Sequence, residues 1–312
     1  MTLNQNVSTG QQVAYKLTTR SVTRQLSGVT VLCWLLLSVG CATLPRPVPV
    51  QDGEADQVRR EFRTMLNSQR QCPMALDADV TITVDNLLWS GTLSGYLRAM
   101  APASLRFEGV NPLGLTEAIL AVDGEHFTYL SVRNQQVYSG PLTASAISSY
   151  APDGLATSMS YYWLLGRISP GTLGISDIGL DRDDQGYWLD LQYTATGKQA
   201  MILFDPKEHL VKRHVVLSAQ DSIAVELAYE YSRPRPTPAG TEQSPRPTAA
   251  GIEQNPAASL TETCQLPSRI TISKPGNGRL NLAFTKRYPT PALDSAPFRI
   301  IPPTEYKRTI VQ

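Results

Sequence analysis

Apolar and polar residues alternate along most of this chain, and that period of two limits what it can fold into. Val80, Ile82 and Val84 alternate with threonine and aspartate, and Leu105 and Phe107 alternate with charged residues. Because successive side chains of a strand point to opposite faces, this alternation predicts antiparallel sheet with one apolar and one polar face. Further strands are predicted at 89–98, 116–122, 126–132, 135–139, 187–194, 199–205, 209–217, 222–231, 270–273 and 280–285.

Two segments have the helical period instead. Residues 54–69 carry an apolar stripe of Val58, Phe62, Met65 and Leu66. A second helix is predicted from Asp153 to about residue 166, with the stripe Leu155, Met159, Tyr162 and Trp163. Together the segments predict a mainly β fold with some α. We expect a half-closed antiparallel β-barrel whose helices cover an apolar concave face and leave an interior cavity.

The N-terminal region contains the apolar run VTVLCWLLLSVGCATL, at residues 29–44. It is shorter than the ~20 apolar residues that span a bilayer. Basic residues precede it and small residues end it, as in a secretory signal peptide over residues 1–40. The ending Ser38–Cys41 resembles the bacterial lipoprotein signal, in which the cysteine is lipidated. The alternative is an ordinary signal that holds a cysteine by chance.

Lipidation at Cys41 would make the chain a membrane-anchored protein without a membrane span, followed by a tether over 41–53. Two or three acyl chains hold a protein on a membrane durably. The residue after Cys41 is Ala42, not the aspartate that marks inner-membrane retention. The resemblance therefore implies the outer membrane, with the protein facing the periplasm. The lipid on Cys41 is the only non-protein group expected.

Charge and cysteine content narrow the classes further. Without residues 1–40 the chain has 25 basic and 27 acidic residues, and no basic cluster, which argues against nucleic acid as a partner. Cys72 and Cys264 are the two cysteines that remain beside Cys41. In an oxidising periplasm an even pair indicates a disulfide, and two buried free thiols are the alternative.

Residues 233–262 differ from the rest of the chain. They contain RPTPAGTEQSP followed by RPTAAGIEQNP, identical at eight positions. Polar, proline-rich sequence of this kind does not bury enough apolar surface to order itself. It is predicted to be an extended insertion, with a binding arm as the alternative, inside one domain over 54–302 that ends in a tail at 303–312.

Residues that could carry catalysis are sparse. His126, His209 and His214 lie on predicted strands or at their ends, where a histidine is ordinarily structural, and no nucleophile elbow, zinc-protease or phosphate-loop motif is present. The segment DRDDQG at 181–186 lacks the glutamate of a calcium loop and lies where a hairpin turn is expected. We therefore expect neither an enzyme nor a metal site.

One stretch resembles a known family. VNPLGLTEAIL, at residues 110–120, resembles the periplasmic loop of the LolB-like outer-membrane lipoproteins of the LolA/LolB superfamily. MSYYWLLGRISPG at 159–171 is similar to that family's short helix ending. QLPSRITISKPGNGRLNLAF at 265–284 is similar to its closing pair of strands.

The resemblance implies an acceptor that shelters acyl chains of lipoproteins in a hydrophobic cavity and helps to insert them into the outer membrane. Its partners would be acylated lipoproteins or lipid and a LolA-like periplasmic carrier, and the chain would be a monomer. Leu113 and Leu115 would form a membrane-insertion loop, although a leucine that only caps the sheet edge is the alternative. The residues expected to line the acyl cavity are Trp89, Leu93, Leu105, Phe107, Ile119, Met159, Tyr162 and Trp163.

Two other functions stay open at this point. The same fold could serve as a non-catalytic accessory or lipid-sensing component of an envelope assembly, because fold does not determine function. An enzyme acting on lipid or glycan would need clustered polar residues, which the sequence does not show. A core without a cavity would favour the accessory function.

Overall fold

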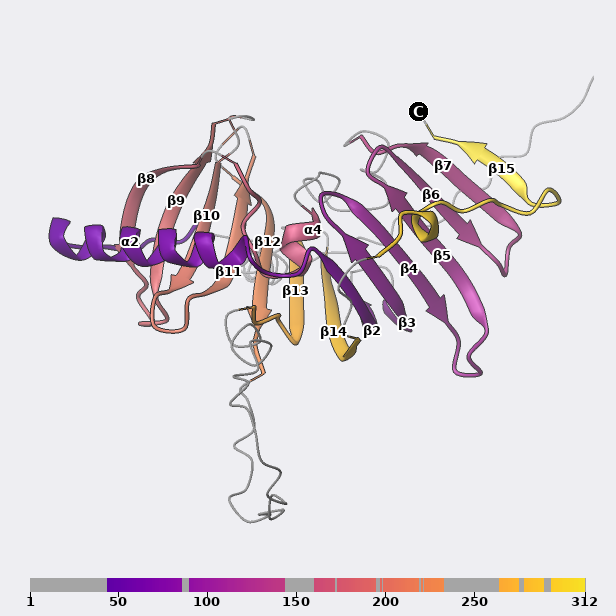
Figure 1. The fold of residues 1–312 in the computed structure, drawn as a ribbon, viewed down its shortest axis with the longest axis horizontal. Coiled ribbons are helices and arrows are strands. Elements are labelled where there is room, and N and C mark those ends of the chain that lie inside the picture. Colours follow the sequence, from indigo (N-terminus) through magenta and orange to yellow (C-terminus); the bar gives the residue numbers. More distant parts are fainter. Residues whose placement is uncertain are drawn as a thin grey trace, which may run out of the picture. The chain divides into compact units, whose positions relative to one another are not determined.

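The computed structural model describes residues 44–85, 90–143, 160–171, 173–194, 197, 199–218, 220, 222–232, 264–274, 278–288 and 293–311 (Figure 1). Its helices are α2 (Asp52–Gln69), α4 (Ser160–Leu164) and the 3-10 turn η1 (Ala296–Phe298). Its strands are β1 (Val48–Pro49), β2 (Ala75–Asp85), β3 (Ser90–Met100), β4 (Ser104–Val110), β5 (Thr116–Asp123), β6 (His126–Ser131), β7 (Gln136–Pro141), β8 (Leu173–Leu180), β9 (Tyr187–Tyr193), β10 (Gln199–Asp205), β11 (Leu210–Leu217), β12 (Ile223–Glu230), β13 (Arg269–Lys274), β14 (Gly278–Tyr288) and β15 (Lys307–Ile310).

Among the described residues, fifteen strands form one open sheet. Its order is β1-β8-β9-β10-β11-β12-β13-β14-β2-β3-β4-β5-β6-β7-β15, so that β1 and β15 are the two edges. Neighbours pair antiparallel, except that β15 runs parallel to β7. The predicted mainly β fold with an open antiparallel sheet is confirmed. The strand β8 was not predicted, because its glycine and serine residues hide the alternation.

The helix α2 covers the apolar face of one half of the sheet, and Figure 1 shows it running across β8 to β11. Val58, Phe62 and Met65 are its buried residues, as the stripe predicts. The Phe62 ring meets the Phe204 ring of β10 edge to face, with 5.4 Å between centroids. Burying this stripe against the sheet is what holds α2 in place, because an isolated helix of this length is marginal in water.

At the other half of the sheet, part of the opposite face is covered as well. Arg106 and Ala121 are cross-strand partners on that face. The turn η1 lies against β4 and β5, and Arg106 Nη1 donates a hydrogen bond to Pro297 O at 2.8 Å. Phe298 in this turn is buried. The segment before β15 therefore packs onto the sheet, which the sequence did not predict.

The strands on either side of the proline-rich insertion are direct neighbours. β12 and β13 pair antiparallel through residues such as Leu227 and Ile272. The insertion 233–262 itself lies outside the described residues, as do the predicted signal 1–40, Cys41, Trp89, Met159 and the start of the predicted helix at Asp153. Of that helix, the described part is α4.

His214 is fully buried on the covered face of β11. It lies between its cross-strand partners Ile202 and Leu227, and its ring meets Trp163 edge to face at 5.5 Å between centroids. Neither ring nitrogen has a hydrogen-bond partner in the part of the chain that the structure describes. Burial away from water lowers the pKa of His214 to about 4, so the ring is neutral at physiological pH.

This burial makes stability depend on pH. As the pH falls from 6.5 to 4, the unfolded chain binds a proton at His214 that the folded chain does not bind. The free energy of unfolding should therefore fall by roughly 3 kcal/mol over this window. Urea unfolding of wild type and His214→Phe at pH 7 and pH 4 measures the difference. The free energy of unfolding should depend less on pH in His214→Phe than in wild type. In His126→Gln, which alters an exposed histidine, it should depend on pH as in wild type. An equal pH dependence in all three proteins would contradict the assignment of the effect to His214.

Candidate functional site

A network centred on Asn111 holds the loop between β4 and β5. The side-chain Oδ1 of Asn111 accepts hydrogen bonds from the backbone N–H groups of Leu113 and Leu115, both at 3.0 Å. The Asn111 N–H donates to Leu115 O at 2.9 Å, and the Gly114 N–H donates to Asn111 O at 2.9 Å. Pro112 restricts its own φ, and Gly114 has a φ of +79°, which glycine adopts without strain. The loop is therefore braced from within.

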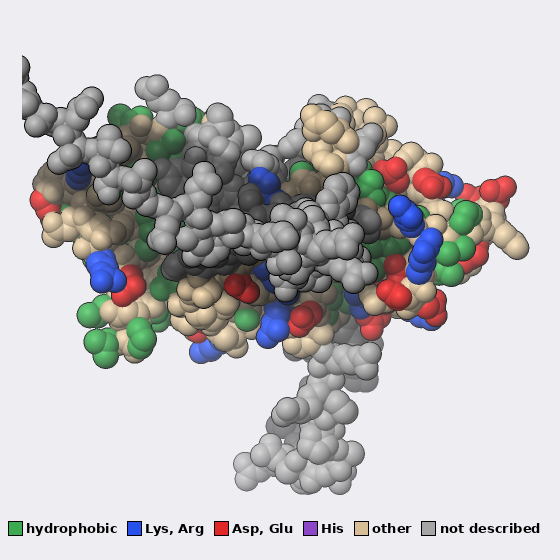
Figure 2. All heavy atoms as spheres, turned by 180° about the vertical axis from the view of Figure 1, so that it is seen from behind, with side chains coloured by type: hydrophobic (Ala, Val, Ile, Leu, Met, Phe, Trp, Pro, Cys, Tyr) green, Lys and Arg blue, Asp and Glu red, His purple; other side chains and the backbone are tan. Residues whose placement is uncertain are grey.

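This braced loop keeps two leucine side chains in solvent. Leu113 is 83% exposed and Leu115 is 62% exposed. Hydrophobic side chains gather at the lower left of Figure 2, which corresponds to the turn between β4 and β5 in Figure 1. Burying a leucine side chain is worth about 1.5–3 kcal/mol. Because the loop cannot fold back, the leucines gain this energy only by entering a membrane or a partner.

An apolar sheet face adjoins the loop. Phe107 pairs across the strands with Leu97 of β3 and with Leu120 of β5, so these three side chains share one face. Leu105 and Phe107 are half-buried and pack against a buried cluster that includes Leu97 and Tyr162 of α4. The strand that ends in the loop thus carries apolar side chains on its α4-covered face.

Two glycines shape the surface of this face. Gly95 and Gly109 are cross-strand partners. A Cβ at Gly109 would overlap Leu93, and one at Gly95 would lie 2.9 Å from a ring carbon of Phe107. The absent side chains therefore let Leu93 and Phe107 lie flat across the neighbouring strand.

The register corrects one predicted lining residue. Ile119 pairs with Glu108 and with Leu130, and therefore lies on the face opposite to Phe107. Its neighbour Leu120 takes the position that was predicted for Ile119. A bulge between Gly109 and Val110 shifts the pairing of β4 with β5. The alternation of β4 therefore does not predict which residues of β5 lie on the same face.

The other predicted lining residues are divided. Leu93, Leu105 and Phe107 share the face described above, and Tyr162 packs beside Leu105 and Phe107. Trp163 belongs instead to the core beneath α2. Trp89 and Met159 lie outside the described residues.

The described part of the chain has few groups for chemistry. It contains no cluster of three or more metal-ligating side chains, and no helix long and apolar enough to cross a membrane. DRDDQG forms the turn between β8 and β9, where the Asp181 N–H donates to Gly186 O at 2.9 Å. The Asp181 carboxylate accepts a hydrogen bond from Trp188 Nε1 at 2.7 Å.

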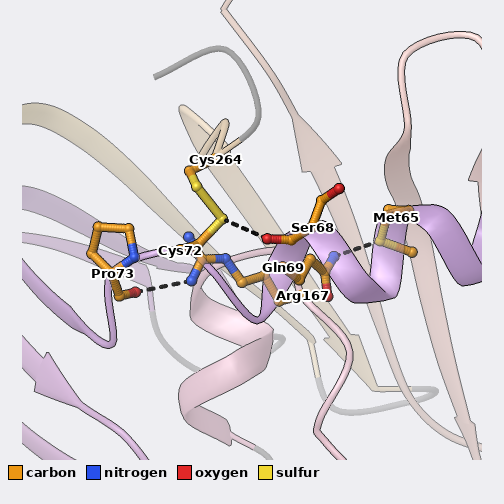
Figure 3. Close-up of a disulfide and its surroundings, with 7 residues drawn as sticks. All are labelled: Met65, Ser68, Gln69, Cys72, Pro73, Arg167 and Cys264. Atoms are coloured by element: carbon orange, nitrogen blue, oxygen red, sulfur yellow. Dashed lines mark hydrogen bonds between the residues drawn. A yellow bond between two sulfur atoms is a disulfide. The ribbon is translucent and has the colours of Figure 1, made fainter. Parts of the chain in front are cut away.

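A disulfide joins the end of α2 to the segment that follows the insertion (Figure 3). Cys72 and Cys264 are bonded, with 5.5 Å between their Cα atoms, as the sequence predicts. Beside it lies a cavity of about 210 Å³. The residues lining the cavity are Met65, Ser68, Gln69, Cys72, Gly166, Arg167, Glu208, His209, Leu210, Val211, Cys264 and Gln265.

This cavity is polar and is not the predicted acyl cavity, because it contains none of the residues predicted to line that cavity. Arg167, on its wall, was missed by the sequence reasoning. The available signal was a single charge in the apolar segment YYWLLGRI.

Comparisons with known proteins find distant likenesses among solved structures. No family model matches the sequence, and no curated protein matches it significantly. A LolA superfamily protein from Nitrosomonas europaea is 9% identical, with a TM-score of 0.48, covering 77% of this chain and 97% of that chain. A domain assigned to outer membrane lipoprotein sorting, from Vibrio parahaemolyticus, is 8% identical, with a TM-score of 0.48, covering 78% and 94%. A DUF1329 family protein from Desulfovibrio piger is 9% identical, with a TM-score of 0.47, covering 78% and 97%.

These likenesses are distant and place the chain in no family. A likeness at this identity and TM-score extends to no function, because one fold hosts many functions. What this chain binds therefore has to follow from its own residues.

The disulfide should contribute strongly to stability. It closes a loop with a sequence separation of 192 residues, for which the chain-entropy model gives up to about 5 kcal/mol. Urea unfolding with and without reductant should show a lower midpoint on reduction. The double variant Cys72→Ser/Cys264→Ser should be insensitive to reductant. Quantitative alkylation of both thiols without reductant would contradict the bond.

Proposed function

We propose that this chain is a non-catalytic lipoprotein of the bacterial envelope, which takes acyl chains on its apolar sheet face and passes them to a membrane. The observation that carries the proposal is the braced loop, which holds Leu113 83% exposed at the end of a strand with apolar residues on its covered face. A side chain so placed is the first part of that face that a bilayer would meet.

The anchor fits this role. A lipid on Cys41 would keep the chain at the periplasmic side of the outer membrane, with residues 41–53 as a tether. The cargo would be an acylated lipoprotein or another lipid delivered by a LolA-like carrier, and the receiving protein would act as a monomer. No nucleotide is needed for such a transfer, because acyl chains move toward the site that offers more apolar contact.

Acyl binding should depend on one face of β5. Leu120 lies on the face of Phe107 and Ile119 lies on the other face. Leu120→Lys should weaken binding of a fluorescent fatty-acyl probe by roughly tenfold or more, because it places a charge against the chain. Ile119→Lys is the matched control, since it alters a neighbouring half-buried residue and should bind as wild type does.

Both variants should keep the wild-type circular dichroism spectrum, so that a loss of binding is not a loss of folding. Equal binding by Leu120→Lys and wild type would exclude this face as the acyl site.

Delivery should depend on the loop. Leu113→Glu should change the free energy of unfolding by less than about 0.5 kcal/mol, because the side chain is exposed. It should still bind acyl cargo but fail to transfer it to liposomes, because a carboxylate does not enter the apolar layer. A transfer assay with labelled lipoprotein measures this.

The matched control is Ile310→Glu on β15. Ile310 is 76% exposed and lies on an edge strand away from the β4–β5 turn (Figure 1). Transfer by this variant should equal wild type. If Leu113→Glu also transfers normally, the loop has no part in delivery, and an accessory role in an envelope assembly becomes the better proposal.

A further inference from the structure

Arg167 is brought to the cavity wall by the way α4 ends. The Gly166 N–H donates to Trp163 O at 3.0 Å, and the Arg167 N–H donates to Tyr162 O at 2.9 Å. This pair of bonds is a Schellman cap, and Gly166 has the positive φ, +63°, that such a cap requires. The cap turns the chain back toward α2, and Arg167 is only 6% exposed.

Among the described residues, the guanidinium of Arg167 has one hydrogen-bond acceptor, a backbone carbonyl. Its Nη1 donates to Pro73 O at 3.0 Å, beside the disulfide (Figure 3). Within the described ranges it forms no ion pair with a carboxylate. A guanidinium carries five N–H donors and stays charged in proteins. A buried cation without a counter-charge is strongly unfavourable.

The ionisable groups around Arg167 do not supply a negative charge. Those that interact with it are the hydroxyls of Tyr161, Tyr162 and Tyr231. Burial raises the pKa of each hydroxyl, so all three are neutral at physiological pH. Burial likewise lowers the pKa of Arg167.

The carboxylates near the cavity already have side-chain partners. Glu208, on the wall, is paired with Lys212. Glu61 is paired with His209, with 3.0 Å between Oε2 and Nε2. Gln69 is engaged too, since its Oε1 accepts a hydrogen bond from the Ile168 N–H at 3.2 Å. Among the described residues that line the cavity, Arg167 is therefore a cation that has no carboxylate partner.

We propose that the cavity beside the Cys72–Cys264 disulfide binds an anionic group, a phosphate or a carboxylate, which Arg167 neutralises. The volume of about 210 Å³ holds several water molecules or one group of that size. A guanidinium matches the paired oxygens of such anions. The group could belong to a free anion or to the headgroup of an amphiphile. The site does not depend on acyl binding elsewhere.

The test is the thermal midpoint of the purified full chain in increasing inorganic phosphate, at ionic strength held constant with chloride. The wild-type midpoint should rise with the logarithm of the phosphate concentration, by about 3–5 °C when phosphate is about ten times its dissociation constant. The midpoint of Arg167→Gln should not respond to phosphate, because the neutral amide offers the anion no positive charge.

Arg287→Gln is the matched control. Arg287 is also an arginine that donates to a carbonyl, Pro267 O, but it is exposed and does not line the cavity. It should lose stability and keep the phosphate response. A wild type that does not respond, or an Arg167→Gln that responds as wild type does, would overturn the proposal.

A second arm identifies the source of the anion. Titration with a soluble short-chain phosphatidic acid should compete with phosphate at the site in wild type and not in Arg167→Gln. Binding about tenfold tighter than phosphate would support a lipid headgroup, and equal binding would support a free anion. No competition in a wild type that responds to phosphate would likewise support a free anion, whereas loss of acyl-probe binding in Leu120→Lys concerns only the sheet face.

Discussion

The pairing of β14 with β2 is the contact on which the rest of the structure depends. It brings together strands from opposite ends of the domain, with Leu282 beside Ile82 and Phe284 beside Val80. Without this ladder the described strands would form two sheets, one from β8 to β14 and one from β2 to β7. Such a non-local pairing must overcome a large loop-closure entropy. The Cys72–Cys264 bond lowers that entropy, because Cys72 lies just before β2 and Cys264 just before β13.

One continuous sheet explains how the functional surface is arranged. α2 buries the covered face from β8 to β14, and α4 continues the apolar packing over β2 to β4. On the next strand, β5, Leu120 is half-buried, and β4 leads directly into the loop of Leu113. The apolar face and the exposed leucines are thus parts of the same pair of strands.

His214 and Arg167 show two ways in which this fold treats a buried basic side chain. His214 has no hydrogen-bond partner, but it can release its proton and become neutral. Arg167 cannot do so at any physiological pH. The lack of a carboxylate partner among the described residues therefore has different physical consequences at the two positions. At His214 it lowers stability in acid, and at Arg167 it leaves a charge that an external anion can complete.

The sequence by itself determined the elements and the local geometry. Alternation predicts β2 to β7 and β9 to β14, and the stripe of Val58 and Phe62 predicts α2, because both signals come from neighbouring residues. The exposure of Leu113 follows from Asn-Pro-Leu-Gly, which turns the chain within four residues. The tertiary structure decided what depends on distant pairing. The bulge at Gly109 sent Ile119 to the other face, and the parallel pairing of β15 with β7 joins segments that share no pattern. Arg167 is a buried cation only because the cap of α4 points it at α2. The sequence shows that the residue is charged, but not that folding removes it from solvent.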